Sequence, residues 1–371
     1  MSLVRRIAEI PKPVLTMLAL AFVAALWVLD YVTGPDFSPL IFYVVPVVLV
    51  VWFGGRWSGI LVSVVAAFAW FFADYLTGRH EQLPRAILYW NGLEKLIFFL
   101  LLAQILATLK SALERERHAR QEFLERELVI AEQVQEHLFP QRAPRMDTLE
   151  CAGVCRPARG VSGDYYDFLP LEDGRMGLAV GDVSGKGLSA ALLMASLQGS
   201  LRSLAAADGA RVDEIVADVN RQLCSLTEPN RFVTLFFGIY DDRRRELSCV
   251  NAGHNAPMLL RAGTDGASPE RLRSGGTVLG FFPEAGWRAE WLSLAPGDLL
   301  VAVTDGVLEA ENAAGEEFGE LRLAEVLAAS RSLSAADLCR AVLSRVAEFL
   351  GGLPAADDLT VVVARGLPAR R

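Results

Sequence analysis

The pattern of hydrophobic and polar positions changes sharply along this chain. Residues 14–108 are mostly apolar, whereas charged residues crowd into the remainder. The apolar part contains four segments, at about 14–33, 38–54, 57–77 and 86–108. A helix needs about 20 apolar residues to span a bilayer. The pattern therefore predicts an all-α membrane domain at 1–108 with about four transmembrane helices, of which the second is short for a span.

Basic residues near the first and last segments predict the orientation of this domain. They are Arg5, Arg6, Lys12, Lys110, Arg115 and Arg117. Basic residues accumulate on the cytoplasmic side of a membrane, so both ends of the domain are expected in the cytoplasm. Arg79 and Arg85, in the second outer loop, do not follow this rule. A cleaved signal peptide is rejected, because further apolar segments follow the first one without a small-residue cleavage site.

Residues 109–140 form a charged segment with no Gly or Pro before Pro140. Phe123, Ile130 and Val134 keep a heptad-like spacing, with polar residues at some of the other positions. A solvated single helix is one interpretation. We favour a short parallel coiled coil that joins two protomers below the membrane and makes the protein a homodimer.

From about residue 141 to residue 371, short strands alternate with helices and glycine turns. Strands are expected at Met176–Val180, Phe232–Tyr240, Glu246–Val250, Met258–Arg261, Arg288–Leu294, Leu299–Val303 and Leu359–Ala364. Helices are expected at Leu188–Leu204, Val212–Leu226, Leu321–Ser330 and Ala335–Leu350. The order lacks βαβ alternation, which predicts an α+β domain with helices packed over antiparallel sheets.

Composition adds two limits. The net charge of −8 argues against nucleic acid as a partner. The five cysteines are an odd number in a large chain and show no zinc-ligand spacing, so reduced thiols in a cytoplasmic domain are expected.

Four turns of the C-terminal domain place an aspartate beside an apolar strand. These aspartates are Asp164, Asp182, Asp305 and, in the fourth turn, the adjacent pair Asp357 and Asp358. One such residue is as compatible with an ordinary turn as with a metal site, but clustered anions repel unless a positive charge lies among them. Ligands that are all oxygen select Mg²⁺ or Mn²⁺. Two such ions about 4 Å apart can deprotonate a bridging water and bind phosphate, so the pattern predicts phosphoester hydrolysis by a metal-bridging hydroxide.

The motifs around these aspartates resemble the SpoIIE-type branch of the metal-dependent PPM serine/threonine phosphatases. They are Gly-Asp-Tyr-Tyr-Asp-Phe, Gly-Asp-Val-Ser-Gly-Lys-Gly, Asn-Ala-Gly-His-Asn, Thr-Asp-Gly-Val-Leu-Glu-Ala and Asp-Asp-Leu-Thr, within roughly 125–365. The resemblance implies an αββα sandwich with two Mn²⁺ or Mg²⁺ ions. By position, Asp182 would bridge both ions, with Asp164 and the Val183 carbonyl on one and Asp305 and Asp357 on the other.

The same resemblance implies a substrate and a mode of regulation. The family acts on phosphoserine or phosphothreonine of STAS-type anti-sigma-factor antagonists. The stretch 127–140 is similar to a helix that acts as a regulatory switch in the family, and 1–108 resembles membrane sensor modules of bacterial signalling proteins. Ser162 stands where the family usually has Gly, which is expected to tighten the turn before Asp164.

Three further residues have two interpretations each. Arg159 is either a catalytic clamp for the substrate phosphate or a plain surface residue. His254 is either a general acid or, as we favour, a structural residue of the Asn251–Asn255 turn. Lys186 either contacts substrate or is simply solvated. The loop Gly181–Gly187 departs from the nucleotide-binding template in spacing and in its last residue, which excludes ATP binding there.

The sequence thus predicts a phosphatase anchored in the bacterial cytoplasmic membrane, with its catalytic domain in the cytoplasm and its activity gated by the membrane and linker segments. A catalytically silent module that binds a phosphoprotein is the alternative. A receptor whose phosphatase acts on a small phosphoester is a second one. All four aspartates are present, which favours the enzyme.

Overall fold

Two units make up the chain, Met1–Leu124 and Glu125–Arg371. The structure is a computed structural model and describes residues 7, 9–33, 40–76, 85–207, 209–226, 231–263, 269–273 and 275–368. Arg5, Arg6 and Arg79, on which part of the predicted orientation rests, lie outside these residues. The end of the predicted linker, from Glu125 on, belongs to the second unit.

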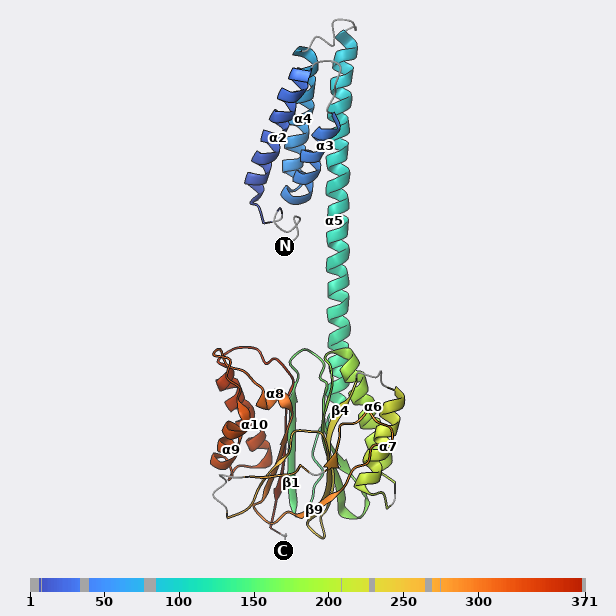
Figure 1. Cartoon of the computed structure of the whole chain (residues 1–371), viewed down its shortest axis with the longest axis vertical. Coiled ribbons are helices and arrows are strands. Elements are labelled where there is room, and N and C mark those ends of the chain that lie inside the picture. Colours follow the sequence, from blue (N-terminus) through green and yellow to red (C-terminus); the bar gives the residue numbers. More distant parts are fainter. Residues whose placement is uncertain are drawn as a thin grey trace. The chain divides into compact units, whose positions relative to one another are not determined.

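Apolar helices form the first unit (Figure 1). They are α2 (Lys12–Thr33), α3 (Leu40–Leu49) with a π-helical turn at Val50–Gly54, α4 (Arg56–Leu76) and the first part of α5 (Arg85–Leu138). Three of the described helices, α2, α4 and α5, are long and apolar enough to cross a membrane. The second predicted span is shorter: α3 has 10 residues, contains Pro46 and continues directly into the π-helical turn. The number of four spans therefore stays a prediction.

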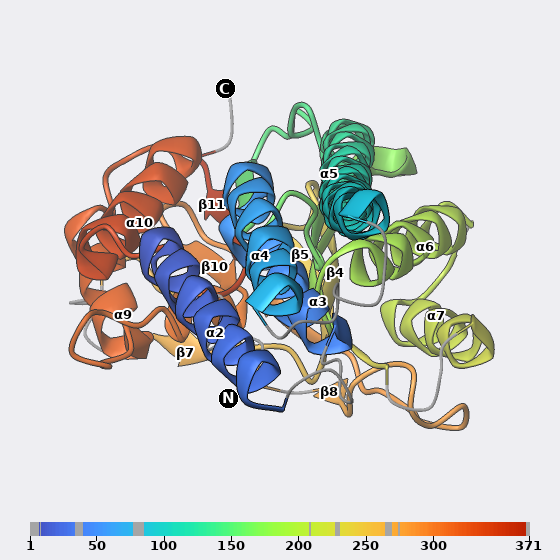
Figure 2. The same cartoon turned by 90° about the horizontal axis from the view of Figure 1, so that it is seen from above.

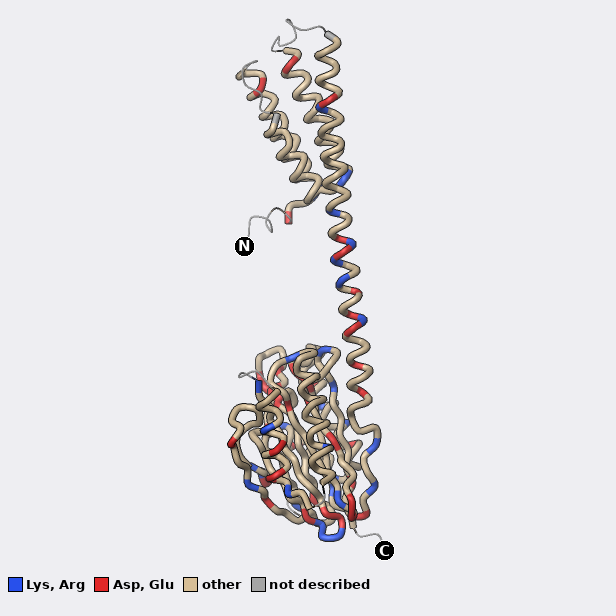
Figure 3. Tube along the Cα trace, turned by 90° about the vertical axis from the view of Figure 1, so that its right-hand side faces the viewer, with Lys and Arg blue, Asp and Glu red and all other residues tan. Residues whose placement is uncertain are grey.

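Helix α5 has 54 residues and ends at Leu138, two residues before Pro140. It contains no Gly or Pro after Gly92. Few charged residues lie in α2, α3, α4 and the first part of α5, whereas they recur along the later part of α5 (Figure 3). The apolar side chains of that later part, among them Phe123, Ile130 and Val134, are exposed. The coiled coil remains a prediction.

Eleven strands of the second unit are described, and they form two sheets whose strand pairs are mostly antiparallel. The first sheet has the order β1 (Leu149–Arg156), β11 (Leu359–Gly366), β10 (Leu299–Val303), β6 (Met258–Leu260), β7 (Glu270–Arg271). The second has the order β2 (Asp164–Pro170), β3 (Arg175–Val183), β4 (Val233–Asp241), β5 (Glu246–Ala252), β8 (Gly275–Gly276), with β9 (Glu290–Ser293) also paired to β5. Of these pairs, only β5 and β8 run parallel.

Helices cover the outer face of each sheet (Figures 1 and 2). Helices α6 (Leu188–Ala205) and α7 (Val212–Leu226) pack on the second sheet, and α9 (Gly319–Ala329) and α10 (Ala335–Leu350) pack on the first. A third apolar core, with Phe236 and Leu300 fully buried, fills the space between the sheets. This four-layer arrangement confirms the predicted α+β fold with helices over antiparallel sheets.

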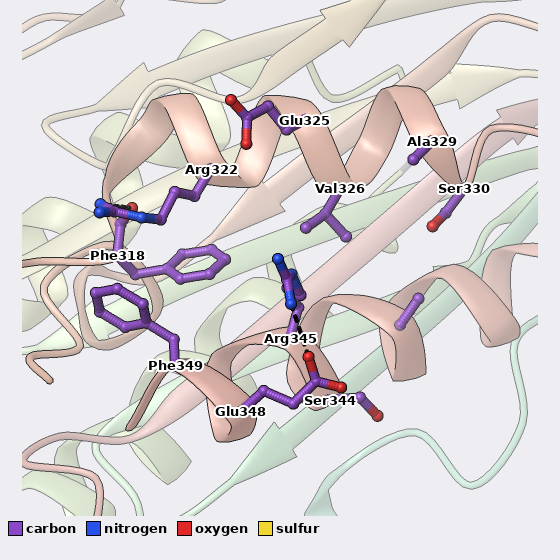
Figure 4. Close-up of a pocket in the computed structure, with 11 residues that line it drawn as sticks. Phe318, Arg322, Glu325, Val326, Ala329, Ser330, Ser344, Arg345, Glu348 and Phe349 are labelled. Atoms are coloured by element: carbon purple, nitrogen blue, oxygen red, sulfur yellow. Dashed lines mark hydrogen bonds and ion pairs between the residues drawn. The ribbon is translucent and has the colours of Figure 1, made fainter. Parts of the chain in front are cut away.

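The outer helix pair α9 and α10 leaves a groove of about 490 Å³ between them (Figure 4). Three of its charged side chains, those of Arg322, Arg345 and Glu348, have partners within it. Arg345 donates to Glu348 at 2.8 Å, and the Arg322 guanidinium lies over the Phe349 ring, 4.8 Å from its centroid. None of the predicted site residues lines this groove.

Candidate active site

Strand pairing brings the first two aspartates together. Asp164 begins β2 and lies directly opposite Asp182, near the end of the neighbouring strand β3. Directly opposed residues of an antiparallel pair project from the same face of a sheet, with Cβ atoms about 5 Å apart. Val183 follows as the buried last residue of β3, and its N–H donates to the carbonyl of Gly163 at 3.3 Å.

The other sheet supplies the remaining two aspartates. Strand β10 ends at Val303, and Asp305 begins the short helix α8 (Asp305–Leu308). Asp357 lies just before β11, the neighbour of β10. All four predicted ligands therefore stand at strand ends on one end of the sandwich, two from each sheet.

Hydrogen bonds between the sheets fix the position of Asp164. Its Oδ2 accepts hydrogen bonds from the Thr304 hydroxyl at 2.8 Å and from the Thr360 hydroxyl at 2.6 Å. Thr304 directly follows β10 and Thr360 lies in β11, so both donors come from the first sheet. Burial raises the pKa of Asp164 well above its ordinary value, and the two hydroxyls act in the opposite direction. The carboxylate thus joins β2 to the ends of β10 and β11.

Repulsion between neighbouring carboxylates contributes to the raised pKa values of Asp182 and Asp305. Burial raises the pKa of Asp182 to about 7, and repulsion from Asp305 and Asp357 acts in the same direction. Burial, followed by the charge of Asp357, also raises the pKa of Asp305. The Lys186 ammonium works against both shifts, so the cluster is an anionic site with Lys186 as a nearby cation.

Lys186 has a defined place in this cluster, which differs from the simple solvated residue that is one interpretation of the sequence. Its Nζ lies 2.7 Å from Asp357 Oδ2 and donates to the carbonyl of Ala356 at 3.0 Å. The side chain of Lys186 is half exposed. It can therefore meet both the carboxylates and a ligand that approaches from solvent.

The two neighbouring aspartates at the start of β11 have different roles. Asp357 pairs with Lys186, whereas Asp358 is turned away onto the turn before β2. Asp358 accepts hydrogen bonds from the N–H of Ala158 at 2.7 Å and of Gly163 at 2.9 Å, and from the Ser162 hydroxyl at 2.7 Å. Asp358 therefore holds the loop that carries Asp164.

The serine at the position where glycine is usual tightens this turn. The Ser162 hydroxyl accepts from the N–H of Asp164 at 3.0 Å while it donates to Asp358. The backbone of Ser162 is held from the other side by Gln135 of α5, whose amide donates to the Ser162 carbonyl at 2.7 Å and accepts from its N–H at 2.8 Å. Sequence reasoning missed Gln135, Thr304 and Thr360, because their partners are distant in the chain.

The donor set meets part of what a divalent ion needs. As they stand, no three His, Cys, Asp or Glu side chains of the described residues lie close enough together to hold one ion. Asp164 is directed at two threonine hydroxyls and Asp357 at Lys186. The chemistry of the set still fits hard cations, since its donors are all oxygen and the repulsion among Asp182, Asp305 and Asp357 is what a bound cation relieves.

Arg159 and His254 lie in different surroundings. Arg159 is exposed in the turn next to Ala158, whose N–H binds Asp358. His254 is buried; its N–H donates to Asn251 Oδ1 at 2.8 Å and its Nδ1 is 2.9 Å from the Thr234 hydroxyl. These contacts give His254 a structural place in its turn, which is the interpretation favoured from the sequence.

A protein-family model matches the greater part of the second unit. The model described as Stage II sporulation protein E (SpoIIE) matches residues 172–366. The matched range includes Asp182, Asp305 and Asp357 and begins after Asp164.

Two curated relatives and one solved structure resemble the chain. Protein IcfG of Synechocystis sp. is 30% identical over 264 residues, which cover 64% of this chain and 41% of that protein. Phosphoserine phosphatase RsbU of Bacillus subtilis is 29% identical over 189 residues, 51% of this chain and 55% of that protein. The chain thus spans about half the length of these relatives. The SiaA-PP2C domain of Pseudomonas aeruginosa shares the fold, with a TM-score of 0.58, 23% identity, and coverage of 67% of this chain and 98% of that one.

Proposed function

We propose that this chain, which belongs to the SpoIIE family, is a membrane-anchored, metal-dependent protein-serine/threonine phosphatase. The observation that carries the proposal is the gathering of Asp164, Asp182, Asp305 and Asp357 from two sheets at one end of the sandwich. A catalytically silent binding module would have no need to retain all four. The three long apolar helices support anchoring in the bacterial cytoplasmic membrane.

The carboxylates of Asp164, Asp182, Asp305 and Asp357, with the Val183 carbonyl, are the groups we propose to hold two Mn²⁺ or Mg²⁺ ions. Such ions, when bound, activate water and neutralise phosphate charge. The protein contributes position: Thr304 and Thr360 orient Asp164, and Asp358 fixes its loop. Lys186 and Arg159 are the cations we propose to meet the substrate phosphate, since Lys186 is exposed beside Asp357 and Arg159 is exposed next to Ala158, whose N–H binds Asp358.

The proposed substrate is a phosphoserine or phosphothreonine protein of the STAS-type anti-sigma-factor antagonist class. Similarity to a phosphoserine phosphatase, RsbU of Bacillus subtilis, supports phosphoserine. The test is phosphate release by the full chain in detergent from a serine-phosphorylated STAS-domain protein, with Mn²⁺ and after chelation. Release that depends on Mn²⁺ is expected. Tight binding of the phosphoprotein without any release would favour the binding module instead.

We propose a route for gating through the linker, supported by a chain of hydrogen bonds that starts on α5. Gln135 is buried on α5 and holds Ser162 by two hydrogen bonds, and the Ser162 hydroxyl in turn holds Asp358 and the Asp164 N–H. At the end of the same helix, the Leu138 carbonyl accepts a hydrogen bond from Gln198 of α6. A displacement of this part of α5 would therefore move the turn that positions Asp164.

We predict that Gln135→Ala lowers the rate of phosphate release by about 10-fold, the lower end of the effect of removing a residue that orients metal ligands. The change leaves the N–H and carbonyl of buried Ser162 without their partners. Gln133→Ala is the matched control, because Gln133 is exposed two residues away on the same helix. Steady-state assays of both variants test the route, and equal activity of the two would contradict it.

Dimerisation through α5 is the second part of the gating proposal. The exposed apolar side chains of its later part include Leu109, Leu113, Phe123, Ile130 and Val134. They follow the spacing of a coiled-coil seam, interrupted by polar residues. A homodimer would bury them, and light scattering of the full chain in detergent measures whether it forms.

A close backbone contact gives a further prediction. A Cβ on Gly306 would lie 2.1 Å from the carbonyl oxygen of Asp358. Gly306→Ala must push the segment of Asp357 and Asp358 away from α8, and we expect a loss of about 1–3 kcal/mol of stability together with loss of most phosphatase activity.

Gly199→Ala is the contrasting variant for Gly306→Ala. Gly199 is exposed inside α6, and a Cβ added there would have no neighbour within 4 Å. Alanine at this position should raise helix stability by about 0.5–1 kcal/mol with activity unchanged. Thermal unfolding and phosphate release of both variants provide the measurement. An active, unperturbed Gly306→Ala variant would show that the two loops are not tightly packed.

A further inference from the structure

Five large apolar side chains are exposed at the start of α6, at the end of α7 and in the loop that follows Leu279. We name them the apolar rim: Leu188, Leu192, Leu226, Phe281 and Phe282. Leu192 is 64% exposed and Phe282 is 62% exposed. Large apolar side chains gathered on a surface indicate a contact with another molecule, whereas single scattered ones do not.

The chain itself places one part of the rim near the cluster. Leu188 begins α6 directly after the turn Gly181–Gly187 and is six residues from Asp182. Leu192 follows one helical turn later on the same face. Six residues span at most about 22 Å even when fully extended, so Leu188 lies within that distance of Asp182.

Arg231 and Phe232 connect the other part of the rim to the same turn. The Arg231 guanidinium donates to the Ser184 carbonyl at 2.8 Å and to the Ser189 hydroxyl at 3.2 Å. The N–H of Phe232 donates to the Ser184 hydroxyl at 2.8 Å. The ring of Phe232 stacks on Phe281, with centroids 5.5 Å apart.

The loop that presents the two phenylalanines is held in place. Val233 and Leu279 exchange backbone hydrogen bonds of 3.0 and 2.8 Å. The Asn220 side chain of α7 accepts from the Gly280 N–H at 2.9 Å and donates to the Phe282 carbonyl at 2.8 Å. Phe281 and Phe282 are therefore exposed on a fixed support, which is the form of a preorganised contact surface.

The size of a protein interface determines what would cover the rim. A specific interface buries about 800 Å² on each partner, a patch with a radius of about 16 Å. A folded protein whose phosphoserine reaches Asp182 extends over the neighbouring surface in the direction of the rim, whereas a small phosphoester does not extend beyond the cluster. Lys186 belongs to the turn that joins the cluster to the rim and pairs with Asp357, so its charge can complement the phosphate.

We propose that the apolar rim is a docking surface for the folded phosphoprotein substrate, and that it contacts apolar side chains beside the phosphoserine. This inference rests on the proposed phosphatase function. It assigns to the rim the recognition of the protein, while the carboxylate cluster and its cations receive the phosphate.

The test compares two substrates with the full chain in detergent: a serine-phosphorylated STAS-domain protein and p-nitrophenyl phosphate. The variants are Leu192→Ser, Phe282→Ser and the double variant. Leu321→Ser is the matched control, since Leu321 is 82% exposed on α9 and outside the rim. We expect the rim variants to raise KM for the phosphoprotein at least about 10-fold, the effect of losing interface anchors, with p-nitrophenyl phosphate kinetics unchanged and the control like wild type.

Other outcomes have distinct meanings. Equal losses with both substrates, or no loss with either, would overturn the docking surface. Hydrolysis of p-nitrophenyl phosphate but not of the phosphoprotein by wild type would also overturn it, and no hydrolysis of either would contradict the proposed function itself. A change of oligomeric state by light scattering, with phosphoprotein kinetics unaltered, would assign the rim to contacts between copies of this chain.

Discussion

Replacing Asp182 by Asn is expected to lower Mn²⁺-dependent phosphate release at least on the order of 10²-fold, because loss of a residue that merely orients a ligand already costs 10–100-fold. Asp182 lies opposite Asp164 on the neighbouring strand and interacts electrostatically with Asp305 and Asp357. Asp182 thus interacts electrostatically with each of the other three aspartates. Asparagine keeps the shape of the side chain and removes its charge.

The fold should survive this change. Asp182 is repelled by Asp305 and Asp357, so removal of its charge relieves repulsion, and thermal stability in the presence of chelator should not fall. Asp218→Asn on the exposed part of α7, where Asp218 pairs only with Arg221 among the interactions of the described residues, is the matched control and should retain full activity.

Phosphate release and thermal unfolding of wild type, Asp182→Asn and Asp218→Asn decide the matter. Loss of activity with intact stability would locate the chemistry at the cluster. Full activity of Asp182→Asn with Mn²⁺ would refute the assignment of the metal centre.

Acidification from pH 7 to pH 4 is expected to cost about 3 kcal/mol of stability through His254 alone. Burial lowers the pKa of His254 from 6.5 to about 4, against a smaller opposite effect of the Val303 backbone. The unfolded chain, with the higher pKa, binds the proton first. The contribution is therefore fully present above about pH 6.5 and is lost as the pH falls towards 4.

His254→Gln isolates this effect, because glutamine does not titrate and can still hydrogen bond to Thr234, the neighbour of His254 Nδ1. The measurement is hydrogen exchange of β4 and β5 peptides in the full chain at several pH values, corrected for the intrinsic exchange rates. Wild type should lose opening free energy relative to the variant as the pH falls. Parallel pH profiles would show that His254 is not buried in its neutral form.

The sequence by itself determined those features that depend on local periodicity. The strand Leu299–Val303 and the helices Val212–Leu226 and Ala335–Leu350 have the predicted bounds, because each carries an uninterrupted apolar pattern of strand or helix period. The end of α5 before Pro140 follows from proline chemistry. The aspartates at strand ends were recognisable for the same reason, since each follows or precedes an apolar run.

Only the tertiary structure decided which groups meet. Strand β1 was missed because Gly153 interrupts its pattern, and that glycine is required where a Cβ would meet the Tyr166 ring at 2.5 Å. Strand β2 was missed because it buries Asp167, which has no reason to be buried until Arg202 of α6 binds it with two hydrogen bonds of 2.8 and 3.0 Å.

The detailed geometry of the site was likewise decided only by the tertiary structure. Thr304 and Thr360 are 140 and 196 residues from Asp164, their common partner. Gln135 reaches Ser162 from a different element. Local periodicity records which face of an element is buried, but not which distant element covers it. The sequence therefore determined the four aspartates and their places at strand ends, and the pairing of the two sheets decided their partners and orientation.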